Sequence, residues 1–564
     1  MFRTKLVAGA VALALTFAVT ASAQVCSFRP GPDVIVGGLT GPTNYGTCCG
    51  GQWEALSLGT TSCNLGDTNL IWIANNNQHP VIGGNLYRLK DNGGWWAFEQ
   101  VGQSWLKHGF FALSQNLCCS NCSSTSGSAL GVGCSDPYTS SRNGQQGNLG
   151  PKWQVDATKG LFTYPPANPS FSGATARRLE VQTADLEATA TSTTRYYGEG
   201  HYVSPDDAQA DNHDNNASYR QMNVAGSGSN WTFSFTGNTQ REKSAIRAWL
   251  ESGVDANVSL EEIDTPSEGS RLVLGHSATD MGGGMWHYEY ALYNMNSDAS
   301  VRAFEVTSGD ATVVNNTDFH DVAYRWGDGP GSSNFDGTDW PLTQAGGTLK
   351  WETVGNYNPP SDISHNAIRW GNTFNFRFDA NTPPTTGDVT LTLYKGENSF
   401  TVSGIQVPSG TSSFGNFFCN DSDGSLAACP CGNPGNPDSG CDNQQGTGGV
   451  FMEATAFSPD GFGGGTAEFT GTGYPAATSP SYVLLRSTSQ TAAVAAFDGA
   501  ICVGNPVVRV GAGFAIGGTA VEPYTHGAMA AAGTNYYQMW YRNTPAMFCT
   551  PDGANLSNGY DLDW

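Results

Sequence analysis

The sequence predicts an all-β, multi-module protein of sandwich-like sheets that are stapled by disulfides and accompanied by little helix. Three observations support this fold class. The chain holds 72 glycines and 28 prolines, and charged residues make up only 13% of it. Short β-branched and aromatic runs alternate with turns rich in Gly, Asn and Ser, as expected for antiparallel strands. The third observation is an even number of cysteines, fourteen.

The N-terminus predicts export. Arg3 and Lys5 precede an apolar stretch over residues 6–19, and Ala21-Ser22-Ala23 fits a cleavage signal. This pattern indicates a secretory signal peptide over residues 1–23. The alternative, a membrane anchor, is disfavoured because a span needs about 20 apolar residues. No later stretch is apolar enough to cross a bilayer, so we expect a secreted protein, either extracellular or at the cell surface.

The cysteines fall into two groups, eight before residue 135 and six after residue 418. Because each group is even, each can close on itself through disulfides, which persist in exported proteins. A zinc site around Cys118, Cys119 and Cys122 is the alternative, but zinc sites usually use two separated pairs or added histidines. We expect disulfides at Cys26, Cys48, Cys49, Cys63, Cys118, Cys119, Cys122, Cys134, Cys419, Cys429, Cys431, Cys441, Cys502 and Cys549.

Residues 24–400 are expected to form a large β-rich region, with a division into two packed modules near residue 253. Expected strands are Leu70–Ala74, Trp95–Val101, Trp231–Phe235, Trp286–Tyr293, Thr373–Phe378 and Val389–Tyr394. Within Trp286–Tyr293 one face is aromatic and apolar, whereas the other carries His287 and Glu289, so we expect a half-buried strand. One helix is expected over residues 241–252, with an apolar stripe that includes Trp249 and Leu250.

A Ser- and Gly-rich stretch suggests a linker over residues 401–418, followed by a C-terminal β module over residues 419–564. The C-terminal module contains no lysine, and short apolar runs alternate in it with Gly-rich turns. We expect a β-sandwich or jelly-roll-like module with a disulfide-stapled entry loop.

Short motifs rich in Cys, His and aromatic residues occur in both parts of the mature chain. The C-terminal motifs are Ala428-Cys429-Pro430-Cys431-Gly432-Asn433 and Tyr536-Tyr537-Gln538-Met539-Trp540-Tyr541-Arg542. The N-terminal motifs include Gln78-His79-Pro80-Val81-Ile82, Trp105-Leu106-Lys107-His108-Gly109-Phe110 and Phe319-His320-Asp321-Val322. Together these motifs resemble those of modular secreted proteins of planctomycete-type bacteria, and the resemblance covers most of the mature chain. It implies an exported, modular protein, and it carries over no site residue because the group has no established activity.

Four histidines in aromatic surroundings are the candidate metal ligands or acid–base groups: His79, His108, His287 and His320. His79 and His108 flank a segment that fits a hairpin pair, so their imidazoles are expected to meet. A convergent set would suit copper or zinc, or serve as a hydrolytic base. The alternative is that each imidazole is buried or at a rim and bonded to a backbone carbonyl. No established metal-binding histidine spacing occurs in the chain.

Calcium is a second candidate cofactor. Asp421 and Asp423 lie in Asp421-Ser422-Asp423-Gly424, the short form of a hard-cation loop. The twelfth position of the loop is Gly432, where an EF-hand has Glu, so a plain solvated turn is the alternative.

Aromatic residues suggest a sugar-binding platform. Trp95, Trp96, Trp105, Trp326, Trp340 and Trp370 are the candidates, and core packing is the alternative for each. An acidic stretch at Glu262 and Asp264 resembles a glycosidase strand only superficially, and we interpret it as an acidic loop. The sequence Gly275-His276-Ser277 lacks the second glycine of a nucleophile elbow.

The formal net charge of −23 disfavours nucleic acid as a partner, since phosphate binding needs clustered Lys and Arg. Two hypotheses follow for function. The first is a non-catalytic extracellular or cell-surface protein with a binding or matrix role, its partner a glycan or a surface component. The second is an exported enzyme, either metal-dependent through the four histidines or active on polysaccharides.

Overall fold

The computed structural model describes residues 25–109, 111–167, 173–187, 193–266, 269–282, 284–309, 314–396, 398–409, 414–420, 429–436, 438–459, 464–527, 533–543, 548 and 550–564. The predicted signal peptide lies outside these residues. The fold is all-β with several sheets and little helix, as the composition predicts. None of the helices in the described ranges combines the length and apolarity needed to cross a bilayer.

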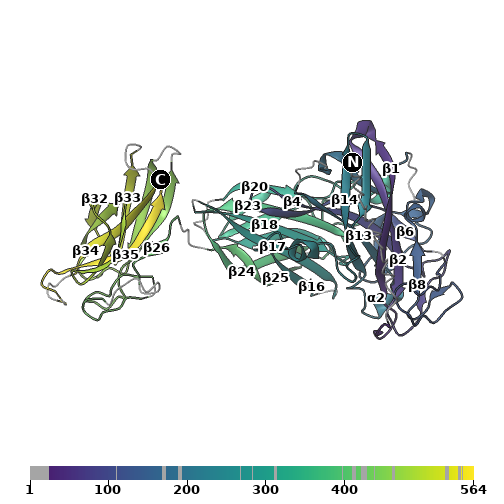
Figure 1. Cartoon of the computed structure of the whole chain (residues 1–564), viewed down its shortest axis with the longest axis horizontal. Helices are drawn as coiled ribbons and strands as arrows, with labels where there is room; N and C mark the ends of the chain where they lie inside the picture. Colours follow the sequence, from purple (N-terminus) through teal and green to yellow (C-terminus); the bar gives the residue numbers. More distant parts are fainter. Residues whose placement is uncertain are drawn as a thin grey trace, which may run out of the picture.

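The N-terminal sheet unit is one large antiparallel sheet, ordered β1-β2-β12-β5-β4-β13-β14-β15, with β6, β8 and β9 joined to it. Figure 1 labels β1, β2, β4, β13 and β14 of this sheet. Its last strand returns to contact β1, so the sheet is nearly closed on itself. Its main strands are β1 (Val34–Cys48), β2 (Trp53–Asn64), β4 (Val81–Asp91), β5 (Trp96–Gln103), β6 (Leu106–His108), β8 (Ser135–Tyr138), β9 (Leu149–Gly150), β12 (Leu179–Gln182), β13 (Arg195–Val203), β14 (Ala217–Ser227) and β15 (Asn230–Phe235).

Short elements decorate this sheet. They are β3 (Leu70–Ile71), which pairs with β7 (Ala129–Leu130), and β10 (Val155–Asp156), which pairs with β11 (Leu161–Phe162). The helical turns are η1 (Cys49–Gly51), α1 (Ser140–Asn143), η2 (Gln146–Asn148), η3 (Lys152–Gln154), η4 (Thr183–Asp185), α2 (Pro205–Gln209) and, before the next unit, α3 (Arg247–Glu251).

The second part is a β-sandwich of two five-stranded sheets. One sheet contains β16 (Ser259–Asp264), β17 (Arg271–Gly282), β18 (Met285–Asn294), β23 (Asn372–Ala380) and β20 (Val314–His320). The other contains β21 (Leu342–Ala345), β22 (Thr348–Glu352), β19 (Val301–Thr307), β24 (Pro384–Leu393) and β25 (Ser399–Pro408). The turn η5 (Pro330–Ser332) lies in the long connection between β20 and β21. Aromatic side chains fill the space between the two sheets, among them Tyr290, Phe304, Trp351 and Phe376.

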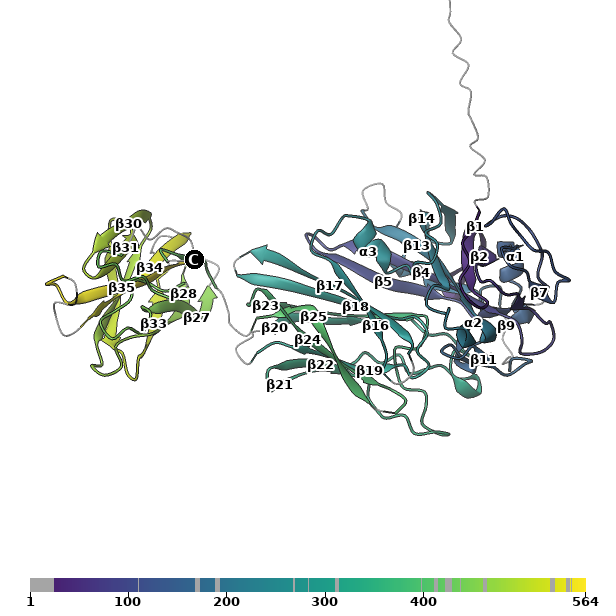
Figure 2. The same cartoon turned by 90° about the horizontal axis from the view of Figure 1, so that it is seen from below.

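A shared core joins the sandwich to the N-terminal sheet unit. It contains Phe98 of β5, Tyr197 of β13, Trp249 of α3 and Tyr293 of β18, all buried. Figure 2 shows α3 beside β13 and β14. The N-terminal sheet unit and the sandwich therefore pack against each other within residues 25–408. This packing places loops of the sandwich against the N-terminal sheet.

The expected helix over residues 241–252 is much shorter in the structure. Only Arg247–Glu251 is helical, and the Leu250 side chain is 45% exposed, so it does not belong to the apolar stripe. The reason lies just before the helix: Gln240 and Lys243 form bridges with β14, and Glu242 has a φ of 59°. These contacts hold residues 241–246 in turns where the periodicity predicts a helix.

The linker is also shorter than expected. Residues 401–408 belong to β25, which pairs with β24. Val402 packs against the sandwich core, and Ile405 and Val407 are buried in it. The apolar side chains in this Ser- and Gly-rich stretch are spaced for a strand, and Gly404 coincides with a break in register.

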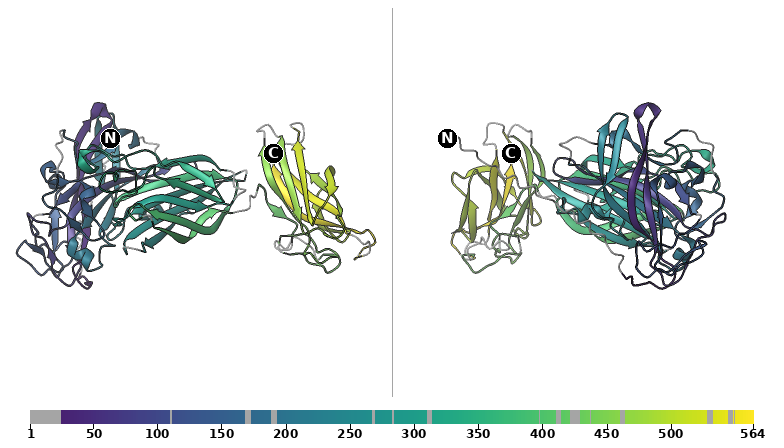
Figure 3. Two further views of the ribbon diagram at one scale, coloured as in Figure 1. Left: turned by 180° about the vertical axis from the view of Figure 1, so that it is seen from behind. Right: turned by 45° about the vertical axis from the view of Figure 1, so that its right-hand side comes forward.

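The C-terminal unit has two sheets around its own core (Figure 3). The larger sheet is ordered β26 (Phe417–Phe418), β35 (Ala554–Asp563), β34 (Thr534–Arg542), β29 (Ser481–Ser487) and β32 (Val508–Phe514). The smaller sheet contains β27 (Phe451–Pro459), β28 (Gly465–Thr472) and β33 (Thr519–His526), and β30 (Gln490–Ala496) pairs with β31 (Gly499–Val503). Buried residues between the sheets include Met452, Phe469, Tyr537 and Leu562.

The disulfides stay within the two groups of cysteines. The pairs are Cys26–Cys119, Cys63–Cys118, Cys122–Cys134, Cys419–Cys502 and Cys429–Cys441. Cys431 is also disulfide-bonded, and Cys549 lies outside the described residues. The three cysteines of the zinc alternative are thus all used in bridges. The prediction of bridges is wrong for Cys48 and Cys49, which are free thiols at the turn that joins β1 to β2.

Candidate binding site at the junction of sheet and sandwich

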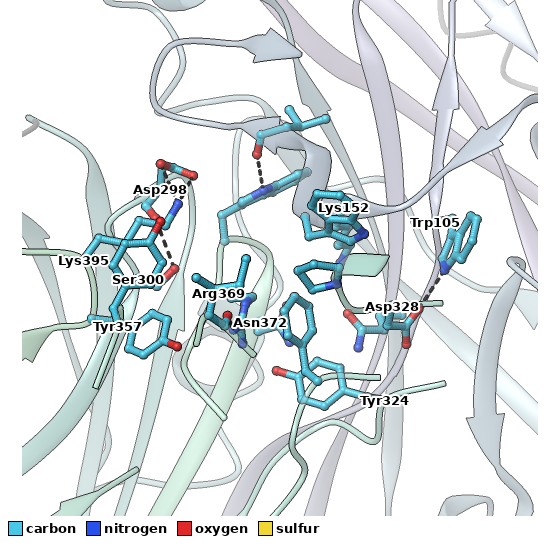
Figure 4. A pocket seen from close by; sticks show the side chains of 18 of the residues that line it. Trp105, Lys152, Asp298, Ser300, Tyr324, Asp328, Tyr357, Arg369, Asn372 and Lys395 are labelled. Atoms are coloured by element: carbon cyan, nitrogen blue, oxygen red, sulfur yellow. Dashed lines mark hydrogen bonds and ion pairs between the residues drawn. The ribbon is translucent and has the colours of Figure 1, made fainter. Parts of the chain in front are cut away.

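A cavity of about 250 Å³ lies where the N-terminal sheet unit meets the loops of the sandwich (Figure 4). We call it the junction cavity. The sheet unit contributes the end of β5, Trp105 and the turn η3, whereas the sandwich contributes four loop segments. Its lining residues are Gln103, Ser104, Trp105, Lys152, Trp153, Val155, Asp298, Ser300, Tyr324, Asp328, Pro330, Phe335, Tyr357, Ile363, Arg369, Trp370, Asn372, Tyr394 and Lys395.

Aromatic side chains form much of the wall. Trp105 and Trp370 are buried, and both indole N–H groups are already used. Trp105 Nε1 donates to Asp328 Oδ1 at 2.7 Å, and Trp370 Nε1 donates to the Val155 carbonyl at 3.0 Å. These bonds fix the orientation of the rings. Trp153 stands at the rim with 37% of its side chain exposed.

Lys152 brings a cation to the cavity. Its Nζ donates to Asn85 Oδ1 at 3.0 Å and lies 5.8 Å from the centre of the Trp370 ring. Burial lowers the pKa of Lys152 to about 8, although the nearby carboxylates Glu199 and Asp328 favour its charged form. The ammonium is therefore largely charged at neutral pH and poorly solvated.

Arg369 brings a second cation. Its guanidinium donates to the backbone carbonyls of Ile363, His365 and Ala367, and it lies over the Phe335 ring with its central carbon 3.4 Å from the ring centre. Burial lowers the pKa of Arg369, but an arginine remains charged throughout the physiological range. Among the described residues, no carboxylate lies within ion-pair distance of Lys152 or Arg369.

The acidic residues of the wall have partners of their own. Asp298 forms an ion pair with Lys395 at 2.8 Å. Asp328 accepts from Trp105 Nε1 and from the backbone N–H of Arg325, and burial raises its pKa. Asp298 is neutralised by Lys395, so Lys152, Arg369 and Asp328 are the remaining charged side chains of the lining, and two cations face one carboxylate. This local excess of positive charge contrasts with the net charge of −23 of the whole chain.

The predicted pair His79 and His108 does meet. His79 Nδ1 lies 3.1 Å from the Ile73 carbonyl, which can only accept, so this nitrogen carries the hydrogen. His79 Nε2 then accepts from His108 Nδ1 at 3.0 Å. Burial lowers the pKa of His79, and burial with His79 and Lys107 nearby lowers that of His108 to about 3. Both rings are neutral and packed against Phe162 and Tyr164.

His287 and His320 lie elsewhere, on the sandwich sheet that faces the N-terminal sheet unit. His287 Nδ1 lies 2.7 Å from Asp379 Oδ1, and its ring stacks on Trp95 at 3.7 Å. His320 Nε2 lies 3.0 Å from the Gln100 carbonyl. The four histidines thus form no common site. Within the described ranges, no group of three or more His, Cys, Asp or Glu side chains is arranged to hold a metal ion.

His320 borders a second cavity of about 490 Å³, which Trp53, Gln100, Asp321 and Asn334 also line. Burial raises the pKa of Asp321 to about 6. The wall of this cavity has fewer aromatic rings than that of the junction cavity, and its lining contains no Lys or Arg.

The calcium candidates Asp421 and Asp423 lie outside the described residues.

Only part of the expected aromatic platform exists. Trp105 and Trp370 line the junction cavity, whereas Trp340 is in the sandwich core, and Trp95 and Trp96 pack between the two units. Trp326 is exposed outside the cavity.

The predicted acidic loop is also corrected: Glu262 and Asp264 lie on β16, where both pair with Arg271. Lys152 and Arg369 are absent from the predicted site because nothing in the sequence marks either as a site residue.

Comparisons with models of known protein families and with curated protein sequences each found no match for this chain.

Proposed function

We propose that this protein is an extracellular binding protein that holds an acidic saccharide in the junction cavity. One observation carries the proposal: aromatic rings and two cations without carboxylate ion-pair partners, Lys152 and Arg369, line the same cavity. Aromatic faces stack on the apolar faces of sugar rings, and the guanidinium and ammonium groups suit a carboxylate or sulfate substituent. The disulfides support a place outside the cytoplasm.

The volume limits the ligand. A cavity of about 250 Å³ lies just below the usual range of ligand sites, about 300–1,000 Å³, so it suits one or two sugar rings rather than a long chain. Trp153 at the rim extends the aromatic surface towards solvent, where the rest of a longer glycan would lie. The proposed ligand is therefore the end or a short segment of an acidic polysaccharide.

The test is isothermal titration of the full chain with uronic-acid oligosaccharides and with neutral oligosaccharides of the same length. We expect binding of the acidic series only. Lys152→Met should weaken binding by about tenfold or more, the cost of losing one charge-assisted contact. Lys243→Met is the matched control, since Lys243 forms an exposed pair with Glu251 and does not line the cavity.

A second pair of variants tests the aromatic contribution. Trp153→Ala should weaken binding, whereas Trp326→Ala, which removes an exposed tryptophan outside the cavity, should leave it unchanged. Equal affinity for acidic and neutral sugars, or equal effects of Lys152→Met and Lys243→Met, would overturn the proposal.

A polysaccharide-active enzyme is the second candidate, and the Lys152 amine favours it. Its pKa of about 8 is close enough to neutrality for the amine to take up or release a proton. The titrations above distinguish the two candidates if the oligosaccharides are recovered and analysed by mass spectrometry. Intact oligosaccharides support binding alone, and shortened chains that Lys152→Met no longer produces would support catalysis.

A further inference from the structure

Cys48 and Cys49 stand apart from the other cysteines of the chain. Every other described cysteine is disulfide-bonded, whereas these two adjacent residues are free thiols, with Cys48 half-buried and Cys49 exposed. They lie where β1 ends and η1 begins, at the tip of the long β1–β2 hairpin. Two neighbouring thiols at an accessible tip are a potential site of thiol–disulfide chemistry.

The turn itself argues for a role of the sulfur. Cys49, Gly50 and Gly51 all have left-handed backbone conformations, with φ of 59°, 74° and 88°. Such positions favour glycine, which two of the three residues are. At the first position, Cys49 adopts a left-handed conformation that is less favourable for cysteine than for glycine.

Arg325 connects the pair to the sandwich. Its Nη2 lies 3.5 Å from Cys48 Sγ and 3.6 Å from Cys49 Sγ. Glu180 Oε1 lies 3.2 Å from the same nitrogen, and the guanidinium lies over the Trp53 ring at 4.4 Å. The Arg325 charge lies beside both sulfurs and favours the thiolate of the exposed Cys49, although the Glu180 carboxylate opposes this effect.

The two thiols differ in acidity. A hydrogen bond with Cys48, followed by the hydrogen bond with Arg325, lowers the pKa of Cys49. Burial and the hydrogen bond with Cys49 raise the pKa of Cys48. The exposed sulfur is therefore the better nucleophile at neutral pH, and the half-buried sulfur keeps its proton.

We propose that Cys48 and Cys49 are a redox-active vicinal pair that exchanges with external small-molecule disulfides, with Cys49 attacking and Cys48 resolving. The Cys49 thiolate attacks one sulfur of the external disulfide, forms a mixed disulfide and releases one thiolate. The Cys48 thiol then gives its proton to the released thiolate and attacks Cys49 Sγ, which forms the Cys48–Cys49 bond, breaks the mixed disulfide and releases the second thiolate, which is protonated by water. In sum the protein dithiol is oxidised, and the external disulfide is reduced to two thiols. Arg325 acts as a positioning residue.

The experiment uses the full chain and glutathione. After mild treatment with reduced glutathione, iodoacetamide should label Cys48 and Cys49 but none of the bridged cysteines. After treatment with oxidised glutathione, the pair should resist labelling, and the intact mass should fall by two hydrogens relative to the reduced protein. A pair that glutathione can neither oxidise nor reduce would overturn the proposal.

Single variants test the assigned order. Cys48→Ser should accumulate a glutathione adduct on Cys49, because the resolving thiol is missing, whereas Cys49→Ser should form its adduct at least tenfold more slowly. Arg325→Gln should slow alkylation of Cys49 at pH 7 about tenfold, and Arg325→Lys should restore part of the rate. Arg195→Gln, which removes a guanidinium far from the pair in sequence, is the control. Equal adduct rates in Cys48→Ser and Cys49→Ser would contradict the assignment.

Discussion

Lys152 loses its charge closer to neutrality than a lysine in water because burial disfavours the ammonium form. An acidic sugar keeps its negative charge above pH 5, so only the lysine changes over the neutral and mildly alkaline range. We expect the affinity for uronic-acid oligosaccharides to be constant near pH 7 and to fall as the pH rises through about 8. Titration calorimetry from pH 6 to pH 10 measures this, and Lys152→Met should show no such decline.

Arg377 is the centre of a buried ionic network between sheet and sandwich. It contacts Glu289 Oε2 at 2.8 Å, Glu99 Oε1 at 2.7 Å and Asp318 Oδ2 at 3.2 Å. Burial alone would raise the pKa of Glu99, but His320, Arg377 and Arg88 together hold it well below its usual range. A carboxylate with a depressed pKa stabilises the fold above its unfolded pKa, and this stabilisation is lost as the pH falls.

Arg377→Gln should therefore destabilise the protein by about 3–5 kcal/mol, because it leaves the buried Glu289 without its arginine partner and leaves Glu99 with Arg88 alone. Chemical denaturation at pH 7 measures the change. Lys243→Gln, at an exposed ion pair with Glu251, should cost less than about 1 kcal/mol. The loss in Arg377→Gln should shrink towards acid pH as the carboxylates are protonated, and a loss that is independent of pH would contradict the ionic explanation.

The His79–His108 pair uses three of its four ring nitrogens in one chain of hydrogen bonds that ends at the Ile73 carbonyl. We expect this pair to be a structural feature of the core rather than a metal site. Elemental analysis should find the same copper and zinc content in the full chain and in His108→Gln. The substitution should instead lower the midpoint of thermal unfolding. A stoichiometric metal that is lost in His108→Gln would show the reverse.

Some residues of the candidate sites can be predicted from the sequence, and others cannot. Hairpin reasoning brings His79 and His108 together correctly, because their separation is set by local pairing of β4 with β6. Trp105 and Trp370 were among the candidate platform residues, but Lys152 and Arg369 were not. Their meeting depends on how the sandwich loops pack against the turn η3, and no local pattern encodes that contact.

Among the elements, β18 shows why one strand can mislead. Alternation correctly places Tyr288, Tyr290 and Leu292 in the sandwich core. The opposite face was expected to meet solvent, yet His287 and Glu289 are buried, 4% and 1% exposed. The N-terminal sheet unit covers this face, so its polar residues are part of an interface. A polar face of a strand predicts exposure only when no other unit packs on it.

The short helix α3 gives a direct test of that interface. Trp249 is fully buried in the shared core and donates its Nε1 hydrogen to Asp255 at 3.0 Å, whereas the next residue, Leu250, is 45% exposed. Trp249→Ala should destabilise the N-terminal part by about 3–5 kcal/mol. Leu250→Ala should cost less than about 1 kcal/mol. Comparable losses measured by denaturant unfolding would contradict the packing described for this helix.

In the whole molecule, the hydrophobic cores divide the chain into a large N-terminal part and a smaller C-terminal part. The N-terminal sheet unit and the sandwich share the core around Phe98, Trp249 and Tyr293, and loops from both form the junction cavity. The two clusters of the C-terminal unit contain only residues from Phe414 onward. Its disulfides Cys419–Cys502 and Cys429–Cys441 are likewise internal to it. Cooperative unfolding follows shared cores, so residues 25–408 should unfold as one unit and residues 414–564 as another.

Scanning calorimetry of the full chain should accordingly resolve two transitions. Trp249→Ala should move only the transition of residues 25–408, and a separately expressed chain of residues 414–564 should reproduce the other transition at its original temperature. Met539→Ala provides the reciprocal control, because Met539 is buried in the C-terminal core and should move only the second transition. If either substitution shifted both transitions equally, the two parts would stabilise each other, which would contradict the division of the chain into two cooperative units.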